Sequence, residues 1–301
     1  MPGYPQGGGA IASTSLYASK KDVVMATFEL GSATAKGGFA NERAICNKFN
    51  NWKGDSEARL WLKIMGYSVA SIDSVEAIHI PTRMKRADVE QLRLEESYEE
   101  LMKFKKADAQ IRIIITIGKI LKIENLSLKK ANSDSDYNQV DKRWVAAYQE
   151  MWGFSDDVAL GLKLFTGEIS PDSHPEIVKN NVLRDKRRIF LDELPADIRN
   201  KIVNFFAENK ILVVSDIIKG RGGLSANWML VTRNNKEDDT TTWILKDINK
   251  AMNFFGGGEV EVSRRGSLHI GRITMQRKGG TPDPTKLQFK INPCDLFGLA
   301  K

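Results

Sequence analysis

Residues 107–129 read ADAQIRIIITIGKILKIENLSLK, and their pattern is that of a β-hairpin. Two runs rich in β-branched residues, 107–117 and 120–129, are joined by Gly118 and Lys119. A two-residue connection with glycine first is typical of a type II′ turn, because that turn needs a positive φ at its first central position. The stretch therefore predicts an antiparallel hairpin in which Ile117 lies opposite Ile120.

This register brings four polar side chains to one face at the open end of the hairpin. Asp108 lies opposite Lys129 and Gln110 lies opposite Ser127, and opposite residues share a face with Cβ atoms about 4.5–5.5 Å apart. A carboxylate that holds a divalent cation against a phosphate, beside an ammonium group, is a sufficient set of groups for phosphodiester hydrolysis. A cross-strand ion pair that only stabilises the hairpin end fits the same geometry, so both interpretations stay open. Strand alternation puts Glu124 on the opposite face, which excludes it as a metal ligand.

The rest of the chain predicts helices around a mixed sheet. Apolar periodicity and capping residues predict helices at 41–52, 55–65, 88–104, 140–152, 156–165, 195–209 and 247–255. Further strands are predicted at 211–218, 228–233, 241–245, 259–263, 268–276 and 287–291. We therefore expect an α/β fold, in which helices flank a mixed central β-sheet, with a C-terminal β elaboration.

The domain organisation follows from composition. Residues 1–38 are rich in Gly, Ser and Ala and predict a flexible N-terminal arm, with one short helix or strand near 23–30. Residues 39–301 show no linker and predict a single domain.

Composition excludes several classes of protein. With 42% hydrophobic and 28% charged residues, the chain is neither disordered nor fibrous. The two cysteines and three histidines lack zinc-ligand spacing, so any metal must use oxygen ligands. No apolar run approaches ~18 residues and no signal peptide is apparent, so we expect a soluble intracellular protein without a membrane partner.

The positive charge is concentrated near the C-terminus. The formal net charge is +7, and residues 264–301 carry eight Lys and Arg residues against two Asp residues, a local charge of +6. A positive patch on a nearly neutral body is typical of a protein that binds a polyanion, of which nucleic acid is the commonest. A solvated basic surface that only keeps the protein soluble is the alternative.

Asp108, eighteen further residues and then Ser127-Leu128-Lys129 resemble the PD-(D/E)xK signature of type II restriction endonucleases. Ala107 stands where that signature often has Pro, and Ser127 stands where it has Asp or Glu. A hydroxyl is a weaker Mg²⁺ ligand than a carboxylate. The resemblance extends over about residues 39–296. It implies a restriction-endonuclease-like fold, a prokaryotic cytoplasmic location, and Mg²⁺-dependent cleavage of double-stranded DNA.

The resemblance also implies roles for the residues of the hairpin. Asp108 would bind Mg²⁺, with the Leu128 carbonyl as a further ligand. Lys129 would position the attacking water and offset charge on the transition state, and Ser127 would hydrogen-bond to metal-bound water. Glu42 would add an acidic group from an N-terminal helix; alternatively, it only complements the helix dipole in a first turn.

Two segments are expected to contact DNA. Lys130, Asn132 and Gln139 follow the hairpin in a polar stretch that would line the DNA backbone, unless it is a plain polar loop. Residues 264–293 carry the main recognition elements, with Arg272, Thr274 and Gln276 on one strand face and Gln288 and Lys290 on the next, suited to base edges. Arg264, Arg265, Arg277 and Lys278 complete the basic set. A basic sheet face without base readout is the alternative.

The sequence therefore supports two possible functions from different classes of protein. The first is a Mg²⁺-dependent, sequence-specific double-stranded DNA endonuclease, for which a palindromic site would favour a homodimer. The second is a non-catalytic nucleic-acid-binding protein that uses the basic C-terminal patch, with Asp108 and Lys129 as a structural pair.

Overall fold

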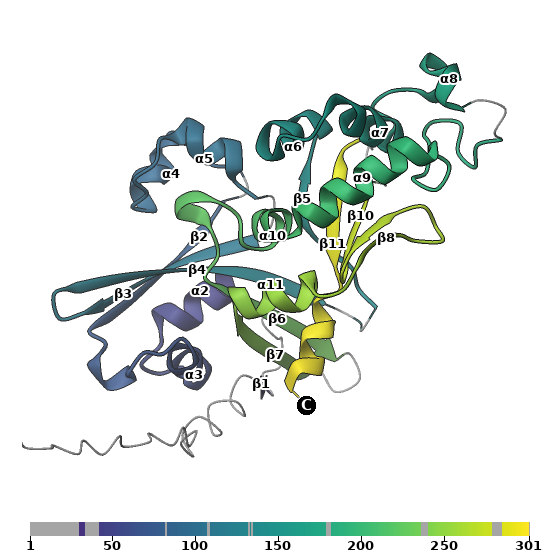
Figure 1. The fold of residues 1–301 in the computed structure, drawn as a ribbon. Helices are drawn as coiled ribbons and strands as arrows, with labels where there is room; N and C mark the ends of the chain where they lie inside the picture. Colours follow the sequence, from purple (N-terminus) through teal and green to yellow (C-terminus); the bar gives the residue numbers. More distant parts are fainter. Residues whose placement is uncertain are drawn as a thin grey trace, which may run out of the picture.

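The computed structural model describes residues 30–33, 42–81, 83–106, 109–131, 133, 135–178, 182–235, 240–278 and 285–300. Two β-sheets with helices packed against them make up the fold (Figure 1), which confirms the expected α/β class. The predicted N-terminal arm lies outside the described residues except for β1 (Leu30–Ala33), which pairs with a strand of the first sheet. Within the described ranges, no helix has both the length and the apolar character needed to cross a bilayer.

The first sheet is mixed and has the order β1-β7-β6-β4-β3-β2. All its neighbours are antiparallel except β4 and β6, which are parallel. Its remaining strands are β2 (Ser74–Ile80), β3 (Ala109–Ile117), β4 (Ile120–Ala131), β6 (Trp228–Asn235) and β7 (Thr240–Asp247).

The β3–β4 hairpin has the predicted register. Ile117 lies opposite Ile120, and Gln110 lies opposite Ser127. Gly118 has a φ of +57°, the conformation that the first position of the turn requires and that glycine adopts at little cost. A register slip of one residue would exchange the two faces of both strands, so the turn glycine determines which side chains share a face.

Two N-terminal helices cover one face of this sheet. They are α2 (Glu42–Asn50) and α3 (Ser56–Ile64), and the Asp55 side chain caps α3 by accepting hydrogen bonds from two backbone N–H groups. Phe49, Trp61 and Trp243 pack edge to face or tilted between the helices and the sheet, with ring centroids 5.3 and 5.5 Å apart. Burial of these large apolar side chains fixes the helices on the sheet.

The second sheet is antiparallel, with the order β5-β11-β10-β9-β8. Its strands are β5 (Asn138–Arg143), β8 (Val260–Val262), β9 (Leu268–Ile270), β10 (Ile273–Arg277) and β11 (Leu287–Ile291). Figure 1 shows α6 (Val145–Trp152), α7 (Asp156–Thr166) and α9 (Ala196–Glu208) beside this sheet. Trp152 stacks on Tyr148 and meets the ring of Phe289 edge-on, which joins helix and sheet in one core.

Shorter elements connect these layers. The helices are α4 (Arg86–Gln91), α5 (Tyr98–Phe104), α8 (Pro175–Val178), α10 (Lys210–Val214) and α11 (Ile248–Gly256). The 3₁₀ helices are η1 (Val69–Ser71), η2 (Pro171–Ser173), η4 (Gly222–Leu224) and η5 (Pro293–Ala300), and η3 (Ser215–Lys219) is a π-helix.

The predicted strand at 211–218 is wrong, because this segment forms α10 and η3. Val213, Val214, Ile217 and Ile218 are buried, whereas Ile211 is 83% exposed. Two buried pairs spaced by four residues follow the helical period, and a short β-branched run does not distinguish a strand from a buried helix.

The predicted helix at 88–104 is divided into α4 and α5. Arg93 has a φ of +51° at the end of α4, and Ser97 then caps α5 together with Glu100. The spacing Ser97-x-x-Glu100 is that of a capping box and marks a new helix start.

Two further differences affect the second sheet. The predicted helix at 140–152 begins only at Val145, because Asn138–Arg143 forms β5 along β11. The predicted strand at 268–276 is a hairpin of β9 and β10, with Gly271 at a φ of +56° in its turn. Arg272 therefore lies in a turn and does not share a strand face with Gln276.

Candidate active site

The open end of the β3–β4 hairpin brings together three of the predicted polar residues. Gln110 and Ser127 lie opposite each other, and Lys129 is two residues further along β4 on the same face. Their exposed fractions are 1%, 0% and 4%, so all three are buried. Asp108 lies outside the described residues, directly before β3.

Lys129 is fixed by a strand of the other sheet. Its Nζ donates a hydrogen bond to the backbone carbonyl of Gln139, 3.2 Å away on β5. Gln139 was predicted to contact DNA, and its side chain is half-buried. The contact holds the ammonium group on the face that Ser127 and Gln110 share.

The atoms at this site that could bind a cation are oxygen atoms. The Gln110 amide nitrogen donates to the Leu224 carbonyl, 3.1 Å away, whereas the Gln110 Oε1 atom is buried without a hydrogen-bond partner. An unpaired buried carbonyl oxygen costs free energy unless a water or cation satisfies it. Together with the hydroxyl of Ser127, it forms an environment that suits a hard cation such as Mg²⁺.

The other metal-site predictions have separate outcomes. The Leu128 side chain belongs to the core beneath α2 and α3, and the metal-ligand role of its backbone carbonyl stays a prediction. In the described part of the chain, no three His, Cys, Asp or Glu side chains gather as a metal cluster. Glu42 begins α2, and α2 packs on the face opposite Ser127, in the core that contains Ile111 and Leu126. Burial and, to a lesser extent, the nearby charge of Glu42 raise the pKa of the Cys46 thiol to about 12.

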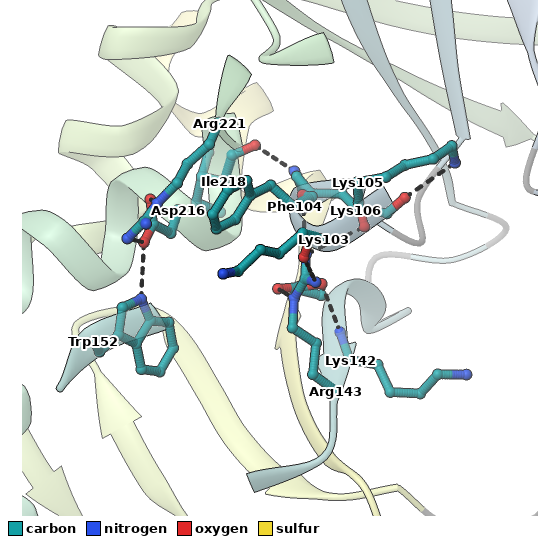
Figure 2. Close-up of polar contacts among 11 residues, drawn as sticks. Lys103, Phe104, Lys105, Lys106, Lys142, Arg143, Trp152, Asp216, Ile218 and Arg221 are labelled. Carbon is teal, nitrogen blue, oxygen red and sulfur yellow. Dashed lines mark hydrogen bonds and ion pairs between the residues drawn. The ribbon is translucent and has the colours of Figure 1, made fainter. Parts of the chain in front are cut away.

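A dense set of polar contacts holds the segment before Asp108 (Figure 2). The guanidinium group of Arg143 donates to the carbonyls of Lys103, Phe104 and Lys105 at 2.8, 3.0 and 3.2 Å. The Lys106 Nζ atom donates to the Ile218 carbonyl, 2.5 Å away. These contacts do not follow from the sequence, because β5 has no strand pattern and no motif marks the residues.

The carboxylate of Asp141 holds the guanidinium group of Arg143 in place. This carboxylate accepts hydrogen bonds from the Arg143 Nε atom at 3.1 Å and from the Lys142 backbone at 2.9 Å. Burial raises the pKa of Asp141, while Arg143 and Lys106 oppose that shift by favouring the charged form. A second buried carboxylate, Asp216, pairs with Arg221 and accepts a hydrogen bond from Trp152, as Figure 2 shows.

Several predicted DNA-contacting residues line a hollow on the polar face of the second sheet, which we call the second-sheet hollow. It encloses about 550 Å³. Thr274 lies opposite His269 on one side and Lys290 on the other, and Lys290 lies opposite Gln139, so one cross-strand row spans β9, β10, β11 and β5. The lining residues are Tyr137, Ser263, Arg264, Arg265, Ser267, His269, Thr274, Gln276 and Lys290.

The remaining predicted DNA-contacting residues that the structure describes do not line the hollow, although Gln288 lies directly opposite Gln276. Exposed Arg272 stacks on the Phe254 ring at 4.5 Å, and Gln288 is only 2% exposed. The Arg277 side chain is 11% exposed and forms an ion pair with Asp185 at 3.6 Å. Lys130 is exposed and Lys278 half-buried, whereas Asn132 lies outside the described residues.

Two comparisons with known proteins found similarity to restriction endonucleases. The model of the R.HinP1I restriction endonuclease family matches residues 97–297, about two thirds of the chain, including both the hairpin and the second-sheet hollow. The restriction endonuclease MspI, solved in complex with its cognate DNA, is similar with a TM-score of 0.48 and 10% identity, over 90% of this chain and 87% of that chain. No curated protein matches significantly. The chain belongs to the R.HinP1I restriction endonuclease family and is a type II site-specific deoxyribonuclease that binds DNA.

Proposed function

We propose that the protein hydrolyses one phosphodiester bond per DNA strand with Mg²⁺ as cofactor, at the open end of the β3–β4 hairpin. The observation that carries this proposal is the burial of Gln110, Ser127 and Lys129 on one face beside the position of Asp108. Asp108 and the Leu128 carbonyl would hold the metal. Mg²⁺, when bound, would supply a positive charge against the phosphate oxygens.

Lys129, Ser127 and Gln139 have separate roles in the proposed reaction. Lys129 orients the water whose oxygen bonds to phosphorus while one phosphorus–oxygen ester bond breaks, and its charge offsets the negative charge that develops on the phosphate. Ser127 orients a water of the metal site through its hydroxyl. The Gln139 carbonyl keeps the ammonium group in place between substrate turnovers.

We assign recognition to the second-sheet hollow. Gln276 and Thr274 offer an amide and a methyl group to base edges, and Lys290 offers a cation from the neighbouring strand. Arg264 and Arg265, exposed at the rim between β8 and β9, suit phosphates. A palindromic site would be bound by two copies of the chain, each with its nuclease domain formed by residues 39–301, in the cytoplasm of a prokaryotic cell.

Digestion of plasmid DNA tests the proposal. The wild-type protein with Mg²⁺ should give discrete bands, and removal of the metal with a chelator should abolish them. A protein that binds the plasmid at all metal concentrations without cutting it would instead be a non-catalytic nucleic-acid-binding protein.

A further inference from the structure

We propose that Arg143 is a positioning residue that couples the second sheet to the catalytic hairpin. This inference rests on the proposed function, because it assigns recognition to one sheet and hydrolysis to the other. It names β5 as the element through which DNA bound in the second-sheet hollow positions residues 103–106, which precede Asp108 in the sequence.

Strand β5 belongs to the recognition sheet, but one of its ends contacts the catalytic hairpin and the other contacts the segment that precedes the hairpin. Near its start, the Gln139 carbonyl accepts the hydrogen bond of Lys129. At its end, Arg143 contacts the residues that precede Asp108. One strand therefore contacts both Lys129 and the segment that precedes Asp108 in the sequence.

Arg143 provides hydrogen-bond donors for the last carbonyl groups of α5. The carbonyls of Lys103, Phe104 and Lys105 lie where α5 ends, and terminal carbonyls of a helix have no partner within it. A planar guanidinium group carries five N–H donors, so one side chain can bind all three carbonyls and still donate to Asp141. The side chain is 12% exposed, which shields these bonds from competition by water.

Lys106 fixes the same segment from the other side. Its ammonium group donates to the Ile218 carbonyl in η3, and its side chain is almost fully buried. Gly220 has a φ of +87°, and a Cβ atom there would lie 2.9 Å from the Lys106 Cδ atom. Glycine is therefore required for the conformation and for the close approach. Asp108 follows Lys106 by only two residues, so a shift of this anchor displaces the carboxylate.

The second-sheet hollow reaches Arg143 through one neighbouring strand. Lys290 lines the hollow and lies opposite Gln139, while Leu287 on the same strand lies opposite Arg143. A duplex seated on β10 and β11 thus acts on β5 directly through the strand ladder. Displacement of a catalytic group by about 1 Å can cost about a hundredfold in rate, so small shifts suffice to separate cognate from random DNA.

Arg143→Ala and Arg143→Lys test the coupling, with Lys48→Ala as a matched control. Lys48 is also part-buried and pairs with two carboxylates, Asp55 and Glu57, but it belongs to α2, which packs on the opposite face of the first sheet. Affinity for the cleaved duplex is measured in Ca²⁺, the single-turnover cleavage rate in Mg²⁺, and the unfolding free energy in urea. For Arg143→Ala we expect a rate loss of about tenfold or more, with the dissociation constant within about twofold of wild type.

The two other variants separate positioning from stability. Arg143→Lys should recover part of the rate, because an ammonium group keeps the charge but binds fewer carbonyls. Lys48→Ala should lose stability and keep the wild-type rate. The proposal is overturned if Arg143→Lys cleaves at the wild-type rate while Arg143→Ala cleaves within about twofold of wild type. It is also overturned if Arg143→Lys cleaves at the wild-type rate while Arg143→Ala is unfolded. Equal losses of rate and affinity in Arg143→Ala would also overturn it.

Hydrogen exchange of the wild-type protein gives a second test without any substitution. In Ca²⁺, the cognate duplex should slow amide exchange in residues 103–106, and a random duplex should not. Equal exchange with both duplexes would refute the coupling even if the enzyme cuts DNA. A wild-type protein that cuts no DNA with Mg²⁺ would refute the proposed function instead, so the two failures are distinguishable.

Discussion

Gln110 and Ser127 lie directly opposite each other on β3 and β4, and both side chains are buried on the face that carries Lys129. The pair places an unpartnered amide oxygen on the same face as a hydroxyl at the open end of the hairpin. Ser127 stands where the resembled signature has a carboxylate. Because the Ser127 hydroxyl is neutral, Asp108 would carry most of the negative charge in the proposed metal site.

Ser127→Ala should therefore reduce cleavage less than Asp108→Ala and mainly raise the Mg²⁺ concentration needed for half-maximal rate. A hydroxyl contributes less to binding a hard cation than a carboxylate does. Titration of Mg²⁺ at saturating DNA measures the effect. Thr166→Val is the control, because it removes a buried hydroxyl from α7, remote from the hairpin. A loss as deep as that of Asp108→Ala would make Ser127 a primary ligand.

Gln276→Ala should relax specificity, whereas Arg264→Ala should weaken all DNA binding. Loss of a bidentate contact to a base edge removes about 1–3 kcal/mol of discrimination at one base position. A phosphate contact carries no sequence information, so its loss lowers the salt slope by about one unit for cognate and random duplex alike. Dissociation constants in Ca²⁺ over a salt series test both. An unchanged specificity ratio in Gln276→Ala would leave the hollow as a basic surface without base readout.

Asp185→Asn should destabilise the protein near neutral pH and have little effect in strong acid. The hydrogen bond from Arg187 lowers the pKa of Asp185 from 3.8 to about 2. A depressed carboxyl pKa contributes stability above the unfolded value, and that contribution is lost as the pH falls through the folded value. Urea unfolding of wild type and Asp185→Asn should thus show a difference that closes between pH 3.8 and about 2. A difference that persists below this range would assign the effect to packing.

The sequence predicts the catalytic hairpin well because its determinants are local. Gly118 sets the turn, and the turn sets the register that brings Gln110, Ser127 and Lys129 together. The helices α3, α7, α9 and α11 were also predicted near their observed bounds, since capping residues and apolar periodicity lie within each segment.

The missed features depend on tertiary contacts. Strand β5 reads NQVDKR, which has few strand-forming residues, and it is a strand because β11 pairs with it. Because β5 is not predicted, the hydrogen bonds of Arg143 to residues 103–105 and of Lys129 to the Gln139 carbonyl do not follow from the sequence. The Gly271 turn was read as part of one strand, which placed Arg272 beside Gln276 on a face that the structure does not give it.

The most direct test of the catalytic assignment is a parallel plasmid digestion by wild type, Asp108→Ala and Lys129→Ala in Mg²⁺, with cognate binding measured separately in Ca²⁺. Because each residue acts on the reacting phosphate or its metal, both variants should lose cleavage by about three orders of magnitude or more while cognate binding stays detectable. Wild-type cleavage by either variant would contradict the assignment of this hairpin as the catalytic site.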